Sequence, residues 1–504
     1  MDAPRAPRKG ISSNECKAWQ HVGNCREAGD DALMTRVSLT PHADRLLPTD
    51  PLVRSIARGI YESIAALPII SPHGHVDPAL LVADEPFPNP ATLFISPDHY
   101  TTRLMHASGV DLADLGVGRS DLTEAEARKA WSIFCEHWSV YNGTPVQYWF
   151  ESELANIFGI TEVPSSENAN AIYDQIAAKL QTPEFRPRAL LSEFKIELLA
   201  TTDDPADSLE SHQALKADDS FTGRVIPTFR PDRYLEALKP GWSDAVSALA
   251  ASSGIDCGTY SGFLAAMENR RAFFKANGAL TTDHSHLDSY MTRLSDEVAS
   301  ALYSQALSGT ISEDGAVAFR RHMMWQMARM STEDGLVMTL HHGVYRNHHN
   351  PTLEKFGADT GHDIPLTVEW VKGMREVLND FGTHPNLRMV LFALDDSGWA
   401  RDMASLAGFY PTVYIGSPWW FLDNPTAIRR WREATTEVAG YSRFSGFIDD
   451  TRAFFSIPAR HDMSRRLDAG FLATQVAEHR ISEATAYETA ELWTNSGPRE
   501  VFKL

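Results

Sequence analysis

Cysteine and long apolar runs are both scarce in this sequence. The cysteines stand apart from one another, at Cys16, Cys25, Cys135 and Cys257, and no two of them form a CxxC pair. This spacing excludes a zinc ribbon and a dense disulfide framework, and it fits a reducing cytoplasm. No segment reaches the roughly 18 consecutive apolar residues that a membrane span needs. We therefore expect a soluble, cytoplasmic protein that has no membrane partner.

Basic residues are also in the minority. Lysine and arginine number 46 against 66 aspartates and glutamates, which leaves a net charge of -20. A surface of this charge repels nucleic acid and anionic lipid, so a nucleic-acid partner is not expected. The same surface repels small anionic substrates, unless the binding site supplies its own arginine, lysine or metal ion.

The remaining composition is that of an ordinary globular protein. The chain has 504 residues, of which 43% are hydrophobic and 22% charged, and this excludes a largely disordered or fibrous protein. The length accommodates two to four average domains or one elaborated α/β barrel. Residues 1–33 are basic at their start but lack the continuous apolar segment of a signal peptide. We interpret them as an N-terminal tail that can be disordered, or as an over-long gene start, and place the domain start at Met34.

One pattern recurs along the chain, a short apolar segment that ends in polar residues. Helical signals fill the stretches between these segments, and strands that alternate with helices predict a parallel sheet. Polar residues at the carboxyl ends of eight strands predict an α/β fold of the (β/α)8 TIM-barrel type. A doubly wound open sheet is the alternative, but no GxGxxG motif follows an early strand. The eight segments are residues 68–72, 197–204, 224–230, 279–284, 336–343, 388–396, 412–420 and 445–452.

The first two predicted strands are separated by far more residues than one helix needs. Residues 111–187 of this stretch are rich in helical signals, so we predict a helical insertion after the first strand. The barrel would then comprise residues 34–110 and 188–504. A second long connection, residues 231–277, separates the third and fourth strands.

Two short motifs with i, i+2 spacing follow the first and the last predicted strand. His73 and His75 share one face after the first strand, and Asp450 and Arg452 do so at the last, which adjoins the first in a closed barrel. Nitrogen and oxygen ligands of this kind suit Zn²⁺, while Mn²⁺, Fe²⁺ and Ni²⁺ remain open. The alternatives are polar residues in a turn and an Asp–Arg salt bridge that closes the barrel. Taken together, the two motifs favour a divalent metal site.

Titratable residues also gather after the fifth predicted strand. His341 and His342 end this strand, and Arg346 follows in the loop. Adjacent residues of a strand point to opposite faces, so only one of the two histidines can face the barrel interior. At a barrel mouth these residues would supply positive potential for an anionic substrate, and a solvated loop is the alternative. His284, which ends the fourth strand, is a weaker candidate, with a buried structural histidine as the alternative.

Aromatic residues follow two of the predicted strands. Trp419 and Trp420 lie just past the seventh strand, where they can form a stacking wall for a sugar or simply pack a loop. His99 and Tyr100 follow the first strand, and a tyrosine hydroxyl beside a histidine and an arginine can act as an acid or a base. A helix capped by Asp98 is the structural alternative.

Six motifs, in this order, resemble those of uronate isomerase, also called glucuronate isomerase, a family of the amidohydrolase superfamily. The segment HGH stands where that family more commonly has HCH, and HHGVYRNHH is richer in histidine than the family pattern. The resemblance implies a (β/α)8 barrel that interconverts D-glucuronate with D-fructuronate and D-galacturonate with D-tagaturonate. The motifs are HxH at residues 73–75, DHYxxR at 98–103, TTDDP at 201–205, LHxGxxRN at 340–347, GxxWWF at 416–421, and DDTRxF followed by RHD at 449–462.

The resemblance also implies roles for individual residues of this chain. Tyr100, His99 and Arg452 match residues that line the reacting end of the sugar. Arg188 matches an arginine that holds the substrate carboxylate, and Arg230 is the second choice for that role. The implied metal ligands are His73, His75, His341 and Asp450. Trp419, Trp420 and Arg346 are further candidates for substrate binding because of their positions after predicted strands.

The implied reaction agrees with these residue types. An aldose becomes a ketose when a proton leaves C2 and returns at C1 through a cis-enediol. Tyr100 beside Arg452 can take the C2 proton, because a guanidinium that stabilises phenolate lowers the pKa of the phenol. Asp450 can carry a hydroxyl proton, and Arg188 supplies the positive charge that the uronate carboxylate needs.

Two other classes of function remain as alternatives. A metal-dependent hydrolase on the same barrel would use metal-activated water, but it usually has a histidine after the sixth strand, where this chain has Asp395 and Asp396. A non-catalytic binder of sugar acids would not need Tyr100, Asp450 and Arg452 beside a metal. For the isomerase we expect a small uronate substrate, a divalent metal of the zinc type and a homo-oligomer.

Overall fold

Parallel strands form at seven of the eight predicted segments in the computed structural model, which describes residues 38–504. The predicted tail, residues 1–33, lies outside the described residues. The strands are short and almost entirely buried, and they all run in the same direction. Their bounds are β1 Ile69–Ser71, β2 Ile196–Ala200, β3 Arg224–Ile226, β4 Thr228–Phe229, β5 Thr281–His284, β6 Val337–Leu340, β9 Met389–Leu391 and β10 Val413–Ile415.

The third predicted strand is divided into two. β3 pairs with β2 and β4 pairs with β5, and only Pro227 separates β3 from β4. Proline has no backbone N–H, so it cannot continue the ladder at this position. The strands therefore follow one another in the order β1, β2, β3 with β4, β5, β6, β9, β10, which is the order of a (β/α)8 barrel.

The eighth predicted segment, residues 445–452, lies at the expected place without forming a regular strand. On one side the Ser445 backbone N–H donates to the Ile415 carbonyl of β10, at 3.0 Å. On the other side the His75 N–H, just after β1, donates to the Thr451 carbonyl, at 3.0 Å. Gly446 has a φ of 84°, a left-handed conformation that interrupts a β-strand. The segment closes the ring between the last strand and the first.

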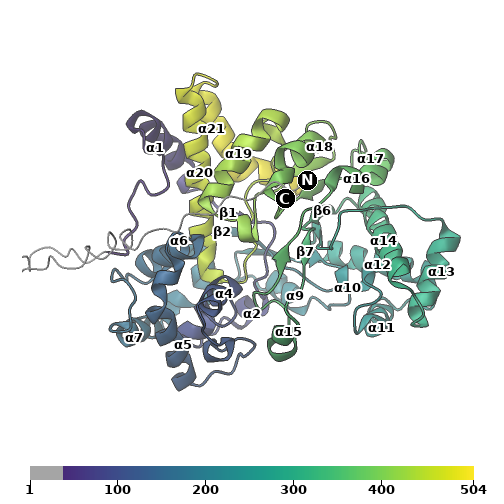
Figure 1. Ribbon diagram of the computed structural model, residues 1–504, viewed down its shortest axis with the longest axis horizontal. Coiled ribbons are helices and arrows are strands. Elements are labelled where there is room, and N and C mark those ends of the chain that lie inside the picture. Colours follow the sequence, from purple (N-terminus) through teal and green to yellow (C-terminus); the bar gives the residue numbers. More distant parts are fainter. Residues whose placement is uncertain (1–37) are drawn as a thin grey trace, which may run out of the picture. The chain divides into compact units, whose positions relative to one another are not determined.

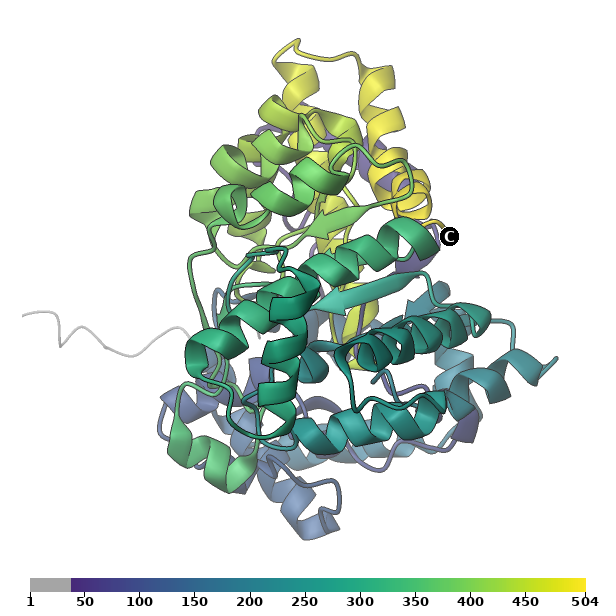
Figure 2. The ribbon, with the colours of Figure 1, turned by 90° about the vertical axis from the view of Figure 1, so that its right-hand side faces the viewer.

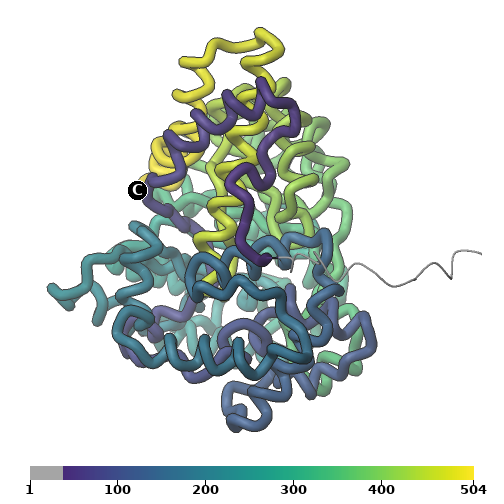
Figure 3. Tube along the Cα trace, turned by 90° about the vertical axis from the view of Figure 1, so that its left-hand side faces the viewer, coloured from purple at the N-terminus to yellow at the C-terminus, as the bar shows by residue number. Residues whose placement is uncertain are grey.

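Helices surround the strands in all three views of the molecule (Figure 1). Figure 2 shows the teal helices α11 to α14 packed over one side of the barrel, and Figure 3 shows the purple helix α1 beside the yellow helix α20. α1 begins at Pro51, because the Asp50 carboxylate accepts hydrogen bonds from the N–H groups of Leu52 and Val53. The bounds are α1 Pro51–Ala65, α11 Trp242–Ser253, α12 Tyr260–Ala276, α13 Asp296–Leu307, α14 Glu313–Asp334, α19 Pro425–Ala439 and α20 Ile457–Ala477.

Helices lie within the predicted insertion, residues 111–187, and also on both sides of it. Seven α-helices of the described chain lie between β1 and β2. Phe94 of α3 packs against Phe455, which precedes α20, with 5.7 Å between the ring centres. Residues 39–504 form one compact unit, so the boundary between insertion and barrel stays a prediction. The helices are α2 Ala79–Ala83, α3 Pro90–Phe94, α4 His99–Ala107, α5 Glu124–Glu136, α6 Pro145–Ser152, α7 Ala169–Leu180 and α8 Pro187–Glu193.

Within residues 38–504, none of the helices combines the length and the apolar character that a bilayer-spanning segment requires.

Candidate active site

Polar side chains that follow the carboxyl ends of the strands line one cavity of about 500 Å³. This is a common size for a site that binds a small molecule. It lies at the end of the barrel where parallel strands place their functional residues. The lining includes His75 after β1, Asp203 and Asp204 after β2, Arg230 and Asp232 after β4, Ser285 after β5, Arg346 after β6, Trp419 and Trp420 after β10, and Asp450, Thr451 and Arg452 from the eighth segment.

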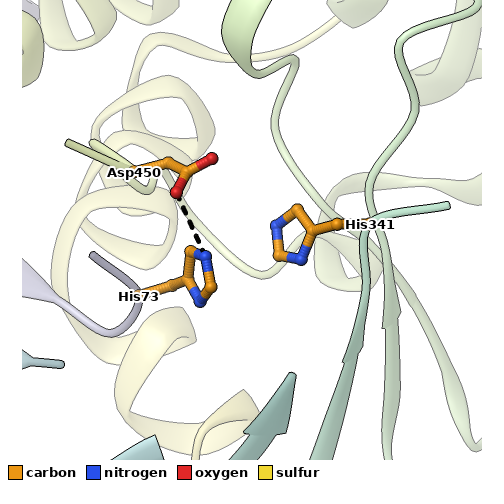
Figure 4. A group of neighbouring side chains, drawn as sticks. All are labelled: His73, His341 and Asp450. Carbon is orange, nitrogen blue, oxygen red and sulfur yellow. Dashed lines mark ion pairs between the residues drawn. The ribbon is translucent and has the colours of Figure 1, made fainter. Parts of the chain in front are cut away.

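Two histidines and one carboxylate converge beside the cavity (Figure 4). The His73 Nε2 atom lies 3.1 Å from the Asp450 Oδ1 atom. His341, from the end of β6, faces both, and one ligand atom from each of the three residues lies within 4.8 Å of the others. His75 Nε2 lies 2.9 Å from the same Asp450 oxygen, at the more exposed edge of this group. The structure therefore brings together all four predicted metal ligands.

The chemistry of these atoms fits a divalent cation. The His341 Nδ1–H donates to the Asp283 carboxylate at 2.7 Å, which leaves the His341 Nε2 lone pair facing the group. His341 Nε2 and Asp450 Oδ1 are buried and have no hydrogen-bond partner among residues 38–504, and His73 Nε2 lies beside this carboxylate oxygen. Buried polar atoms without partners are costly, and a bound cation would satisfy acceptors of this kind.

Burial and neighbouring charges act in opposite directions on the pKa values of the carboxylates at this group. Burial alone would raise the pKa of Asp450, but the imidazoles of His73 and His75 outweigh it and hold this pKa well below its ordinary value. Burial likewise opposes ionisation of Asp283, yet Arg230, His73 and His341 keep its pKa well below the ordinary value. Both carboxylates are therefore anionic at neutral pH, as metal ligation and its supporting hydrogen bonds require.

Tyr100 and His99 enter the cavity from the first turn of α4. The helix starts there because the Asp98 carboxylate accepts a hydrogen bond from the Tyr100 N–H at 2.8 Å, so the capping alternative and the site prediction describe the same residues. The two rings stack at 4.8 Å, and both residues line the cavity. Burial lowers the pKa of His99 to about 3, so its imidazole is neutral at neutral pH.

The expected lowering of the Tyr100 pKa by Arg452 is wrong. Burial raises this pKa, and Arg460, not Arg452, is the main group that opposes the rise. The Arg460 guanidinium lies 4.8 Å from the centre of the Tyr100 ring. Arg452 also lines the cavity, but it faces Asp359, with 3.6 Å between Nη2 and the carboxylate oxygen. The phenol of Tyr100 is therefore protonated in the free site.

Trp419 and Trp420 form one wall of the cavity. Both are buried, and both indole N–H groups lack a hydrogen-bond partner among residues 38–504. Trp419 meets the His341 ring edge-on at 4.7 Å, and Trp420 lies 5.3 Å from the His99 ring. Trp420 has a φ of 51°, a strained conformation for a bulky residue and one that tends to occur at functional sites.

Arg230 and Arg346 supply positive charge to the cavity. Arg230 Nε lies 3.2 Å from Asp232 and 3.4 Å from Asp283, and no hydrogen bond joins its terminal nitrogens to residues 38–504. Arg346 uses its terminal nitrogens on Asp363, at 2.8 Å, and on the hydroxyl of Ser285, at 3.0 Å. Arg230 therefore has the more available guanidinium edge.

The structure places Arg188 outside the cavity lining. Its Nη1 donates to Asp218 at 2.6 Å and its Nε donates to the Leu81 carbonyl at 2.7 Å. Arg188 lies in the first turn of α8, which packs against α2, and its backbone N–H donates to the Asp84 carboxylate at 2.9 Å. These contacts hold its side chain away from the cavity.

Asp283 is a site residue that the sequence analysis missed. It alternates with His284 along β5, so the two side chains face opposite sides of the strand. His284 is the predicted candidate on this strand, whereas Asp283 contacts His341 and Arg230. The pattern Thr-Asp-His at the end of an apolar strand could have identified Asp283, since either the aspartate or the histidine can face the barrel interior.

The family model described as glucuronate isomerase matches residues 49–491 of this chain. The chain belongs to this family. A uronate isomerase of Corynebacterium efficiens is 49% identical over 465 residues, covering 92% of this chain and 98% of that protein. A uronate isomerase of Cutibacterium acnes is 48% identical over 471 residues, covering 94% and 100%. The predicted family is thus confirmed.

Solved structures agree with this assignment. The crystal structure of glucuronate isomerase from Caulobacter crescentus superposes with a TM-score of 0.90 at 41% identity, covering 92% of this chain and 97% of that one. The uronate isomerase structure from Thermotoga maritima gives a TM-score of 0.85 at 29% identity, with coverage of 92% and 99%. The predicted α/β barrel fold is confirmed.

The hydrolase alternative gains no support from the residues after β9. Asp395 stands at the position where a hydrolase usually has a histidine, and its Oδ1 accepts a hydrogen bond from the Ser397 N–H at 3.0 Å. It is not among the residues that line the cavity.

Proposed function

We propose that this protein interconverts aldose and ketose forms of hexuronates, D-glucuronate with D-fructuronate and D-galacturonate with D-tagaturonate. The observation that carries the proposal is the histidine–carboxylate group beside Tyr100 and Arg230 in one cavity, in a chain that belongs to the glucuronate isomerase family. The substrate is a small anion, and the cavity supplies the positive charge that the net charge of -20 withholds.

Substrate binding is assigned to the arginines and the tryptophan wall. Arg230 is held by Asp232 and Asp283 through Nε, so its terminal nitrogens can donate two parallel hydrogen bonds to the uronate carboxylate. The buried indole N–H groups of Trp419 and Trp420 are suited to sugar hydroxyls. Arg346 lies over the Trp420 ring, at 5.3 Å, and adds positive potential.

His73, His75, His341 and Asp450 would hold a divalent cation, for which the nitrogen and oxygen donors favour Zn²⁺. A cation bound there supplies a positive charge that polarises a carbonyl or hydroxyl oxygen. Asp283 orients the ring of His341 and fixes its tautomer.

Proton transfer is assigned to Tyr100, Asp450 and Arg452. Tyr100 takes the proton from C2 and returns it at C1, and Asp450 carries the hydroxyl proton between O2 and O1 of the cis-enediol. Arg452 stabilises the negative charge that develops on the sugar oxygens. His99, neutral and stacked on Tyr100, presents the Nδ1 atom that has no hydrogen-bond partner among residues 38–504 and can contact a sugar hydroxyl.

The raised pKa of Tyr100 gives this mechanism a specific pH dependence. Phenolate is rare at neutral pH when the pKa exceeds its ordinary value, and its fraction grows tenfold with each pH unit. A phenolate of high pKa is in turn a strong base, which abstraction of a proton from carbon needs. We therefore expect kcat/KM to rise with pH through the neutral range.

The experiment is direct. The zinc-loaded protein is incubated with D-glucuronate, and NMR monitors the appearance of the ketose. The Tyr100→Phe variant, checked for fold and metal content, is the matched control. Ketose formation by the wild type and not by the variant supports the proposal.

A cytoplasmic location and a homo-oligomer stay predictions of the sequence. Light scattering on the purified protein measures the oligomeric state, and a monomer at micromolar concentration would contradict the second of them.

A further inference from the structure

A second group of histidines and carboxylates lies on the other face of β5. Asp232 is the first residue of α10 Asp232–Leu235, and His284 and His286 lie at and just after the end of β5. Both histidines are buried. Asp232 Oδ1 lies 3.2 Å from His286 Nε2 and 4.0 Å from His284 Nδ1, and one ligand atom from each residue lies within 4.8 Å of the others.

The hydrogen bonds of His286 determine which of its nitrogens is free. Its Nδ1 lies 2.8 Å from the Glu236 carboxylate, which can only accept when ionised, so Nδ1 carries the hydrogen. In the neutral imidazole the Nε2 atom then presents a lone pair towards Asp232. A carboxylate that holds the far nitrogen of a histidine is the usual support of a metal-binding imidazole.

His284 and Asp232 likewise each use one side-chain atom in hydrogen bonds and leave the other towards the group. The His284 Nε2 atom lies 3.0 Å from the Thr282 hydroxyl, and its Nδ1 has no hydrogen-bond partner among residues 38–504. Asp232 uses Oδ2 on the Ser285 N–H, at 2.9 Å, and on Arg230 Nε, at 3.2 Å. Its Oδ1 is also without a partner in that part of the chain.

When the His284 ring carries its hydrogen on Nε2 and donates it to the Thr282 hydroxyl, three buried acceptors face one another with no donor between them. His284 Nδ1, His286 Nε2 and Asp232 Oδ1 all lack hydrogen-bond partners among residues 38–504. Each would cost free energy if left in this condition. Two imidazole nitrogens and one carboxylate oxygen are a common set of ligands for a zinc-type cation.

His342 adjoins this group but does not belong to it. Its Nδ1 accepts a hydrogen bond from the His286 backbone N–H at 3.1 Å. The hydrogen of the neutral ring is then on Nε2, which cannot act as a ligand in that form.

We propose that Asp232, His284 and His286 bind a second divalent cation of the zinc type, separate from the ion assigned to His73, His341 and Asp450. The two groups share no residue, and Arg230 lies between them, in contact with Asp232 of one and with the supporting Asp283 of the other. A cation here fixes Asp232, and through it the guanidinium that faces the cavity.

The test is the number of zinc ions per chain. Wild type and variants are stripped with a chelator, reloaded with ZnCl₂, dialysed and analysed by mass spectrometry of the metal. We expect two ions in the wild type, one in His341→Ala, one in His286→Ala and none in the double variant. His106→Ala, a change at an exposed histidine away from both groups, should keep two.

A wild type that holds one ion, lost in His341→Ala and retained in His286→Ala, would overturn the proposal, and would instead indicate a proton shared within the second group. Asp232→Asn, which preserves shape and removes the charge, serves if His286→Ala does not fold. X-ray anomalous scattering at the zinc edge from His341→Ala crystals gives an independent answer, with a peak expected between Asp232 and His286. The readout is occupancy, so loss of isomerase activity does not affect it.

Discussion

Replacement of Arg230 by methionine tests which arginine binds the substrate carboxylate. Two residues compete for this role, because the family resemblance favours Arg188 and the structure gives Arg230 access to the cavity. Arg188 is occupied by Asp218 and by the Leu81 carbonyl, outside the cavity lining. Arg188→Met is therefore the matched control for Arg230→Met, with the same chemical change at a different place.

The expected magnitude follows from the contact that is lost. A hydrogen bond to a charged group contributes about 1.5–3 kcal/mol, and about 1.4 kcal/mol corresponds to a factor of ten. The Arg230 side chain is 25% exposed, so solvent screens part of this energy. We expect Arg230→Met to raise KM for D-glucuronate by about tenfold or more, while Arg188→Met leaves KM within about twofold.

The assay compares initial rates for the uronate with those for the neutral aldose of the same stereochemistry. Arg230→Met should reduce the preference for the uronate, because only the charged substrate loses a partner. The change also leaves Asp232 and Asp283 without their arginine, so thermal unfolding and zinc content are measured alongside. Arg230→Lys keeps the charge and should recover part of the loss. A raised KM in Arg188→Met with an unchanged KM in Arg230→Met would refute the assignment.

Four further predictions concern proton transfer, metal binding and stability. Tyr100→Phe should keep its fold and zinc but lose about 10²–10⁴ in kcat, the usual contribution of a positioned acid or base. The kcat/KM of the wild type should rise with pH, and a flat profile from pH 6 to 8.5 would contradict the role of Tyr100 as a base. In D₂O the ketose should carry deuterium at C1 whenever the transferred proton exchanges, and complete absence of label under all conditions together with an active Tyr100→Phe enzyme would exclude that role. Metal analysis of His73→Ala should show less zinc than the wild type, and unchanged zinc would remove this ligand. Burial raises the pKa of Glu153 to about 8 from an ordinary 4.5, so the folded state favours the protonated acid. The free energy of unfolding should therefore fall as the pH rises from about 5 to 8. This decrease should be smaller in Glu153→Gln, and thermal unfolding of both proteins at the two pH values measures it.

The sequence predicted the barrel because every strand has the same simple signal. An apolar segment followed by polar residues marks both the strand and the end that bears the site. Two departures from regular strands depend on single residues that this pattern does not include. Pro227 divides the third strand, and Gly446 with its φ of 84° prevents a ladder at the eighth.

His73, His75 and Asp450 were predictable as neighbours for the same reason, since they lie at strand ends that adjoin in a closed barrel. Asp283 and Arg460 were not, because their relevance depends on contacts between distant segments. The role of Arg188 was inferred from a motif match, which carries no information about the groups that the guanidinium contacts in the fold. The Tyr100 pKa was misjudged because burial, which raises it, cannot be read from neighbouring residue types.

The most direct test of the account is the conversion of D-glucuronate by the purified, zinc-loaded protein, observed by NMR. We expect signals of D-fructuronate that grow until the two sugars reach equilibrium, and the same mixture when the reaction starts from D-fructuronate. A folded, zinc-loaded protein that leaves both D-glucuronate and D-galacturonate unchanged would contradict it.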